Sequence, residues 1–144
     1  MSSKLRTTSW VLLTVAGSLV LLISLVSASL GYTGDYPIGG TPIAEVAAGR
    51  EPIATALRGI RGTSAAYAAG FAVLFLAIAT GPYRRGETWS WWALFAATAL
   101  LVLVAVARVP LLGIPLGGGG SGQALVLGGV VLLGLLLDVG RLRR

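Results

Sequence analysis

The stretch GPYRRGETWSWW (residues 81–92) decides the fold. It carries two arginines, one glutamate and three of the four tryptophans of the chain. One uncharged run ends just before this basic pair, and another begins just after it. A basic, aromatic turn between two uncharged runs is how a polytopic membrane protein marks a membrane surface. The stretch therefore predicts a turn between two transmembrane helices.

The composition agrees with this interpretation. Of 144 residues, 56% are hydrophobic and 11% are charged, and the mean hydropathy is +0.87. Soluble domains carry roughly 25% charged residues. At ~20 residues for each span, the length allows about four helices in one domain. The runs do not alternate as barrel strands do. We expect an all-α, polytopic membrane protein: a four-transmembrane-helix bundle.

Charge and residue usage exclude several functions. The net charge is +6, but the basic residues lie singly or in pairs beside apolar runs, which argues against nucleic acid as a partner. The chain has no cysteine and no histidine, which removes disulfides, thiol chemistry and most metal and haem ligation. We expect no catalytic residue, no cofactor and no metal. The acidic residues show no catalytic pairing; they are Asp35, Glu45, Glu51, Glu87 and Asp138.

Four spans are predicted within a single membrane domain, residues 1–144. They cover about residues 9–30, 63–80, 88–107 and 123–139. Glycine and proline at 81–82 should end the second span, and Pro110 should close the third. After the fourth span, Asp138 and Arg141 have the spacing of a local ion pair, which would add little stability at a frayed terminus.

The first span has a rival interpretation as a secretory signal. Small residues at 27–29 follow a basic start and resemble a cleavage site. The apolar region from Val11 to Val26 is longer than the ~7–15 residues of a signal core, so a retained helix is favoured.

The connection at residues 31–62 contains two expected helix starts, at Thr41-Pro42 and at Glu51-Pro52. After the second start, apolar residues recur at helical spacing as Ile53, Leu57 and Ile60. This pattern fits a short outer amphipathic helix or an extension of the second span.

Basic residues set the predicted orientation. Seven of them fall on the side of both termini and four on the other side, so both termini are predicted to be cytoplasmic. The connections at 31–62 and 108–122 then face outward. The expected localisation is the cell membrane, as a multi-pass protein.

Two sets of residues are candidate membrane contacts. The first set should anchor the chain at the membrane interface: Trp10, Tyr83, Arg84, Arg85, Trp89, Trp91 and Trp92. The second set is a candidate site for an anionic lipid on the outer face: Arg58, Arg61 and Arg108, beside the glycine run at 117–120.

Residues 82–92 resemble a turn found in small prokaryotic four-helix membrane proteins. The shared element is a similar Arg-Arg/Lys-Gly-Glu-x-Trp-x-Trp turn between the second and third helices, which is RRGETWSW at residues 84–91 here. The resemblance covers about residues 58–95. These proteins are loosely similar to DoxX-like proteins. The resemblance implies a compact four-helix bundle and supplies no catalytic residue. The thiol chemistry associated with DoxX-like proteins has no cysteine here to support it.

Two functions remain. The chain is expected to be an accessory or scaffold subunit without catalytic activity, with membrane lipid and either other membrane proteins or a second copy of itself as partners. The alternative is a binder of lipid or of a small apolar ligand within the bundle. That alternative predicts an enclosed pocket lined by Tyr67, Phe71 and Phe75.

Overall fold

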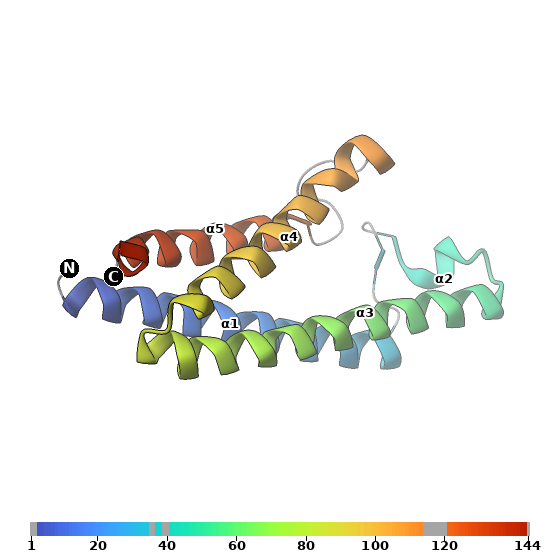
Figure 1. Cartoon of the computed structure of the whole chain (residues 1–144). Coiled ribbons are helices and arrows are strands. Elements are labelled where there is room, and N and C mark those ends of the chain that lie inside the picture. The colour runs from blue at the N-terminus through green and yellow to red at the C-terminus, as the bar shows by residue number, and fades with distance from the viewer. Residues whose placement is uncertain (1–2, 35–36, 39–40, 114–120, 144) are drawn as a thin grey trace. The chain divides into compact units, whose positions relative to one another are not determined.

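The computed structural model describes residues 3–34, 37–38, 41–113 and 121–143, and this part of the chain is helical (Figure 1). The helices are α1 (Ser3–Thr33), α2 (Ile43–Val46), α3 (Glu51–Ile78), α4 (Thr88–Leu112) and α5 (Ser121–Leu137). A π-helical turn, η1 (Ala79–Tyr83), continues α3, and a 3-10 turn, η2 (Val139–Arg143), follows α5. The all-α prediction is confirmed. Asp35 and the glycine run at 117–120 lie outside these residues.

Three of the helices are long and apolar enough to cross a membrane. They are Lys4–Thr33, Glu51–Tyr83 and Thr88–Leu111, of 30, 33 and 24 residues. A membrane core about 30 Å thick needs ~20 helical residues. The fourth apolar helix, Gly122–Leu137, is shorter. These helices indicate membrane localisation, and the second extends well beyond the predicted span at 63–80.

The predicted outer amphipathic helix is not a separate element. Residues 51–61 form the first turns of α3, so the alternative interpretation, an extension of the second span, is correct. Pro52 lies in the first turn, where a missing backbone N–H costs no hydrogen bond. The earlier helix start is also confirmed, since α2 begins directly after Pro42.

Two prolines do not end their helices as expected. Pro82 lies inside η1, where the wide turn accommodates a residue without an N–H. Pro110 lies inside α4, which continues to Leu112. Helix α4 ends at Gly113, whose left-handed φ of 65° lets its N–H reach the carbonyl of Val109. Both prolines therefore lie within helical structure and do not end it.

The chain divides into two compact units, residues 1–18 with 73–144 and residues 19–72. In unit 2 (residues 19–72), α1 and α3 approach each other closely. A Cβ at Gly31 would stand only 3.4 Å from the backbone nitrogen of Gly62. Helix α2 covers the start of α3 through a small cluster of Ile43, Ala47 and Ala54.

Unit 1 (residues 1–18 and 73–144) is built by the start of α1, the end of α3 with η1, and α4, α5 and η2. Helices α4 and α5 pack side by side (Figure 1). Glycines lie where the helices meet: Gly17 faces Phe75, Gly128 faces Val102 and Gly134 faces Leu13. Small residues permit the close backbone approach on which helix association in lipid depends.

Gly128 offers a direct test of this packing. A Cβ at Gly128 would stand 2.6 Å from Cγ2 of Val102, whereas a Cβ at Gly129 would meet nothing within 4 Å. We expect Gly128→Leu to destabilise the fold by about 1–3 kcal/mol, as overpacking does. Gly129→Leu is the matched control and should unfold no earlier than the wild type in an SDS titration followed by tryptophan fluorescence. Equal unfolding midpoints for the two variants would contradict the α4–α5 contact.

Candidate functional site

The most concentrated polar chemistry in unit 1 is a buried cluster that joins α1, η1 and the end of α5. Ser9, on α1, is buried and makes two hydrogen bonds. Its Oγ donates to the carbonyl of Gly134 at 2.6 Å and lies 2.6 Å from the hydroxyl of Tyr83. A serine has one hydroxyl hydrogen, so the hydroxyl of Tyr83 must donate to Ser9. Three elements are therefore joined at one side chain.

The π-helical turn gives Tyr83 its place in this cluster. A π turn adds one residue to a helical turn, which rotates the following side chains about the helix axis. Tyr83 is the last residue of η1 and is fully buried. Its ring also stacks beneath the guanidinium of Arg141, with Cζ 4.0 Å from the ring centroid.

Asp138 and Arg141 complete the cluster as a buried ion pair. Their side chains are 1% and 6% exposed, and Nη2 of Arg141 lies 2.5 Å from Oδ2 of Asp138. The predicted ion pair of Asp138 and Arg141 is present, but the expected frayed terminus is wrong, because η2 turns the chain so that Arg141 lies on Tyr83. Removing either partner would leave a buried charge uncompensated.

Trp91 adds a fourth connection. Its indole N–H donates to the carbonyl of Leu135 at 3.0 Å, and its ring stacks on Phe95. The side chain is 6% exposed, whereas an anchor at the membrane interface, as expected for it together with Trp89 and Trp92, keeps its ring exposed. Both of those tryptophans are about half exposed.

The chemistry available to the cluster is limited by its own bonds. Ser9, Tyr83 and Trp91 donate their hydrogens within the fold, and Asp138 is held against Arg141. A nucleophile or general base needs a free atom within reach of a substrate. In the part of the chain that the structure describes, no group of three or more acidic side chains gathers that could hold a metal. The arrangement is suited to fixing helices in place.

The turn between η1 and α4 carries a second polar arrangement, which is exposed. Nε of Arg85 donates to Oε1 of Glu87 at 2.8 Å, and the indole N–H of Trp89 donates to Oε2 at 2.7 Å. These two hydrogen bonds, with that from Arg85 the stronger, hold the pKa of the Glu87 carboxyl below its ordinary value. Each oxygen of the Glu87 carboxylate thus accepts a hydrogen bond from a neighbouring side chain.

Arg6, at the start of α1, binds the same turn. Its Nη2 donates to the carbonyl of Arg84 at 2.8 Å, and a Cβ at Gly86 would stand 2.8 Å from that nitrogen. Gly86 also has a φ of 95°, which favours glycine. Cζ of Arg84 lies 4.8 Å from the ring centroid of Trp10, which is half-buried.

The structure separates the predicted anchor residues into two groups. Tyr83 and Trp91 are buried, and the others keep solvent- or lipid-facing surface: Trp10, Arg84, Arg85, Trp89 and Trp92. The anchoring role of this second group stays a prediction. Ser9 was not expected at a site, because a lone serine in an apolar run carries no distinctive spacing. Arg141 was expected only as the local ion-pair partner of Asp138, and its contact with Tyr83 joins distant parts of the sequence.

The candidate outer arginines already have partners. Nη1 of Arg58 pairs with Glu51 at 3.1 Å, and Nη1 of Arg61 donates to the carbonyl of Pro37 at 3.2 Å. Both belong to unit 2, whereas Arg108 belongs to unit 1. A joint site of the three arginines stays a prediction.

The chain matches no protein family, no curated protein and no solved structure. The resemblance to DoxX-like membrane proteins therefore stays a prediction, and the site must be interpreted from its own geometry.

The contribution of the buried ion pair of Asp138 and Arg141 to stability can be tested by substitution. Asp138→Asn removes one charge at nearly constant volume and leaves Arg141 buried without compensation. We expect a loss of about 3–5 kcal/mol in the free energy of unfolding, measured by SDS titration in mild detergent. Replacing both residues, as Asp138→Leu with Arg141→Met, should restore most of this loss, since an apolar pair leaves no buried charge. An Asp138→Asn variant as stable as the wild type would show that the pair is not buried in the folded protein.

Proposed function

We propose that the chain is a multi-pass membrane protein with four spans and both termini in the cytoplasm, serving as an accessory or scaffold subunit without catalytic activity. Support for four spans comes from the three long apolar helices together with α5, which is 17 residues long and carries no charged side chain. In this proposal, the buried cluster holds the helices of unit 1 and takes no part in chemistry.

One observation carries the scaffold role: α4 has little cover from the rest of the chain. Only 17% of the most apolar stretch of α4 is buried. Ala96, Leu100 and Leu103 follow one another at i, i+4 and i+7 and are exposed, Leu103 at 63%. A face that combines a small residue with leucines suits close packing against another helix in lipid. This face is well suited to a partner protein or a second copy of the chain.

The alternative, a ligand binder within the bundle, has less support. It expects Tyr67, Phe71 and Phe75 to line an enclosed pocket. Tyr67 is 77% exposed, whereas Phe75 is buried beside Gly17. An aromatic side chain that binds an apolar ligand is normally covered on several sides.

The proposed topology can be tested with single cysteines in this thiol-free chain. Lys4, Arg50 and Arg85 are exposed and suit labelling, whereas Ser90 in the central turn is buried. We expect Arg50→Cys to react with an impermeant reagent in intact cells, and Lys4→Cys and Arg85→Cys to react only after permeabilisation, because basic residues in short connections stay in the cytoplasm. Labelling of Arg85→Cys from outside would overturn the topology.

The scaffold role can be tested by photo-crosslinking in native membranes. A photoreactive phenylalanine analogue at Leu103 should give one discrete protein adduct, with either another protein or a second copy. The same analogue at Leu94, which is 1% exposed, is the buried control and should give no adduct to another chain. The same analogue at Leu74, which is exposed on α3, tests whether an exposed position on another helix also gives a protein adduct. Lipid adducts alone at Leu103 and Leu74 would contradict the scaffold role.

A further inference from the structure

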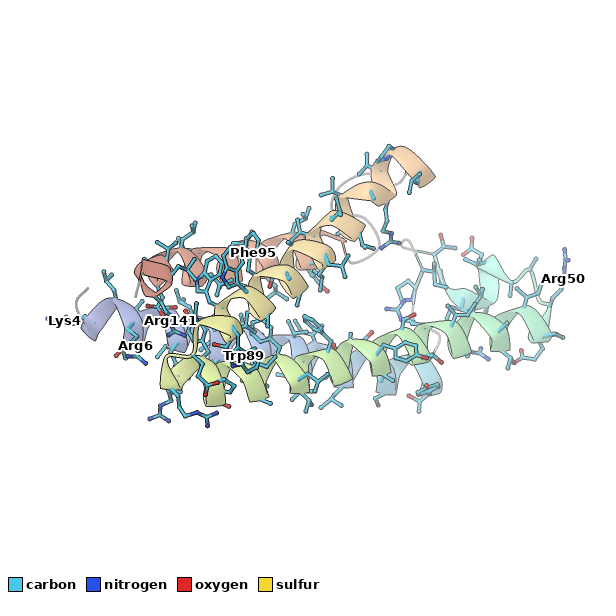
Figure 2. All side chains as sticks on the ribbon, in the orientation of Figure 1. Lys4, Arg6, Arg50, Trp89, Phe95 and Arg141 are labelled. Carbon is cyan, nitrogen blue, oxygen red and sulfur yellow. The ribbon has the colours of Figure 1, made fainter. Side chains whose placement is uncertain are left out.

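Arg6, on α1, and Arg84, in the central turn, lie close to each other beside the first turns of α1. Arg6 lies on α1 and reaches the carbonyl of Arg84 in the central turn. The guanidinium of Arg84 lies over the ring of Trp10, one helical turn after Arg6, with Cζ 4.8 Å from the ring centroid. Both arginines are exposed, and Lys4 is exposed on the same helix end (Figure 2).

The local charge is not balanced. Three salt bridges are present among the described residues, and none includes Lys4, Arg6 or Arg84. The nearest carboxylate in the turn is Glu87, and both of its oxygens are occupied, by Arg85 and Trp89. The other acid of this end, Asp138, is buried against Arg141. Among the described residues of unit 1, no carboxylate therefore forms a salt bridge with Arg6 or Arg84.

The surroundings of these cations are those of a membrane surface. Trp10 is half-buried, and the uncharged run of α1 begins beside it at Thr7. An amphipathic indole ring and flanking arginines lie at the level of lipid headgroups in membrane proteins. Guanidinium groups bind phosphate through paired hydrogen bonds and are weakly hydrated, which makes arginine the better phosphate ligand at such a surface.

We propose that Arg6 and Arg84, with Lys4 beside them, bind the phosphate of an anionic phospholipid headgroup at the end of unit 1. Contacts within the fold preorganise the two guanidinium groups: the Arg84 carbonyl positions Arg6, and the ring of Trp10 positions Arg84. Preorganisation lowers the entropy lost on binding. The site differs from the outer arginines 58, 61 and 108 and requires membrane localisation, but it does not require the scaffold role.

The test compares retention of phosphatidylglycerol and phosphatidylcholine. Protein in mild detergent is mixed with the two lipids at equal concentration, and bound lipid is counted by native mass spectrometry. The wild type should retain phosphatidylglycerol preferentially. Loss of one basic residue near an anionic surface weakens lipid binding enough to lower the retention of phosphatidylglycerol roughly fivefold. We expect that reduction for Arg84→Gln and a reduction of more than tenfold for Arg6→Gln with Arg84→Gln.

Matched controls separate a site from general charge. Arg50→Gln makes the same charge change in unit 2, at an exposed arginine (Figure 2), and should keep the wild-type preference. Arg84→Lys keeps the charge without the paired hydrogen bonds and should lie between Arg84→Gln and the wild type. Arg84→Gln removes no hydrogen bond made by the Arg84 side chain among the described contacts, so folding should persist, as circular dichroism would verify.

Several outcomes would overturn the proposal. An unchanged preference in the double variant would show that Arg6 and Arg84 form no site. An equal loss in Arg50→Gln would show that net charge alone attracts the lipid. Displacement of phosphatidylglycerol by millimolar inorganic phosphate would show that the site takes free phosphate and not a lipid headgroup. Because retention is measured on the purified chain, a negative result leaves the crosslinking result at Leu103 unaffected.

Discussion

The arrangement of unit 1 depends on the two hydrogen bonds of Ser9. Through one hydroxyl, α1 is tied to η1 at Tyr83 and to α5 at Gly134. Hydrogen bonds between helices in a membrane protein average only about 0.6 kcal/mol, because the separated helices also find partners. Their main effect is therefore on register: a short, directional bond fixes which turn of one helix faces which turn of the next. The ion pair of Asp138 and Arg141 reinforces this through the ring of Tyr83.

Such register control needs helices that can approach closely. In lipid, water does not drive helices together, so contact between backbones and side chains supplies much of the attraction. Gly134 illustrates the connection: its carbonyl accepts the bond from Ser9, and a Cβ on this residue would stand 3.5 Å from the Leu13 side chain, at van der Waals contact. The approach is closer at Gly17 and Gly128, where a Cβ would stand 2.9 Å from the Phe75 side chain and 2.6 Å from the Val102 side chain. Close packing and the polar cluster are thus two parts of one arrangement.

Sequence reasoning found the elements but not the contacts between them. The uncharged runs and the Glu51-Pro52 start locate helices, because hydrophobic length and proline at a first turn act locally. Pro82 and Pro110 misled the prediction of helix ends, since a π turn and a tertiary environment can accommodate a proline that local rules treat as a stop. The partnership of Tyr83 with Arg141 joins residues far apart in the chain, and no local pattern records it.

The side chains of the central turn do not all have the single role that its composition predicts. A basic, aromatic turn is typical of a membrane surface, and its arginine, tyrosine and tryptophan side chains were expected to anchor the chain there. Helical geometry instead divides them by direction, because neighbouring positions point about 100° apart on a helix of 3.6 residues per turn. Tyr83 and Trp91 point inward and hold α1 and α5, whereas Arg84 and Arg85 stay exposed. The same short stretch therefore both joins the helices of unit 1 and presents its cations at the surface. Since Arg6 donates to the backbone of this turn, the position of the surface cations depends on the buried contacts that hold α1 beside it.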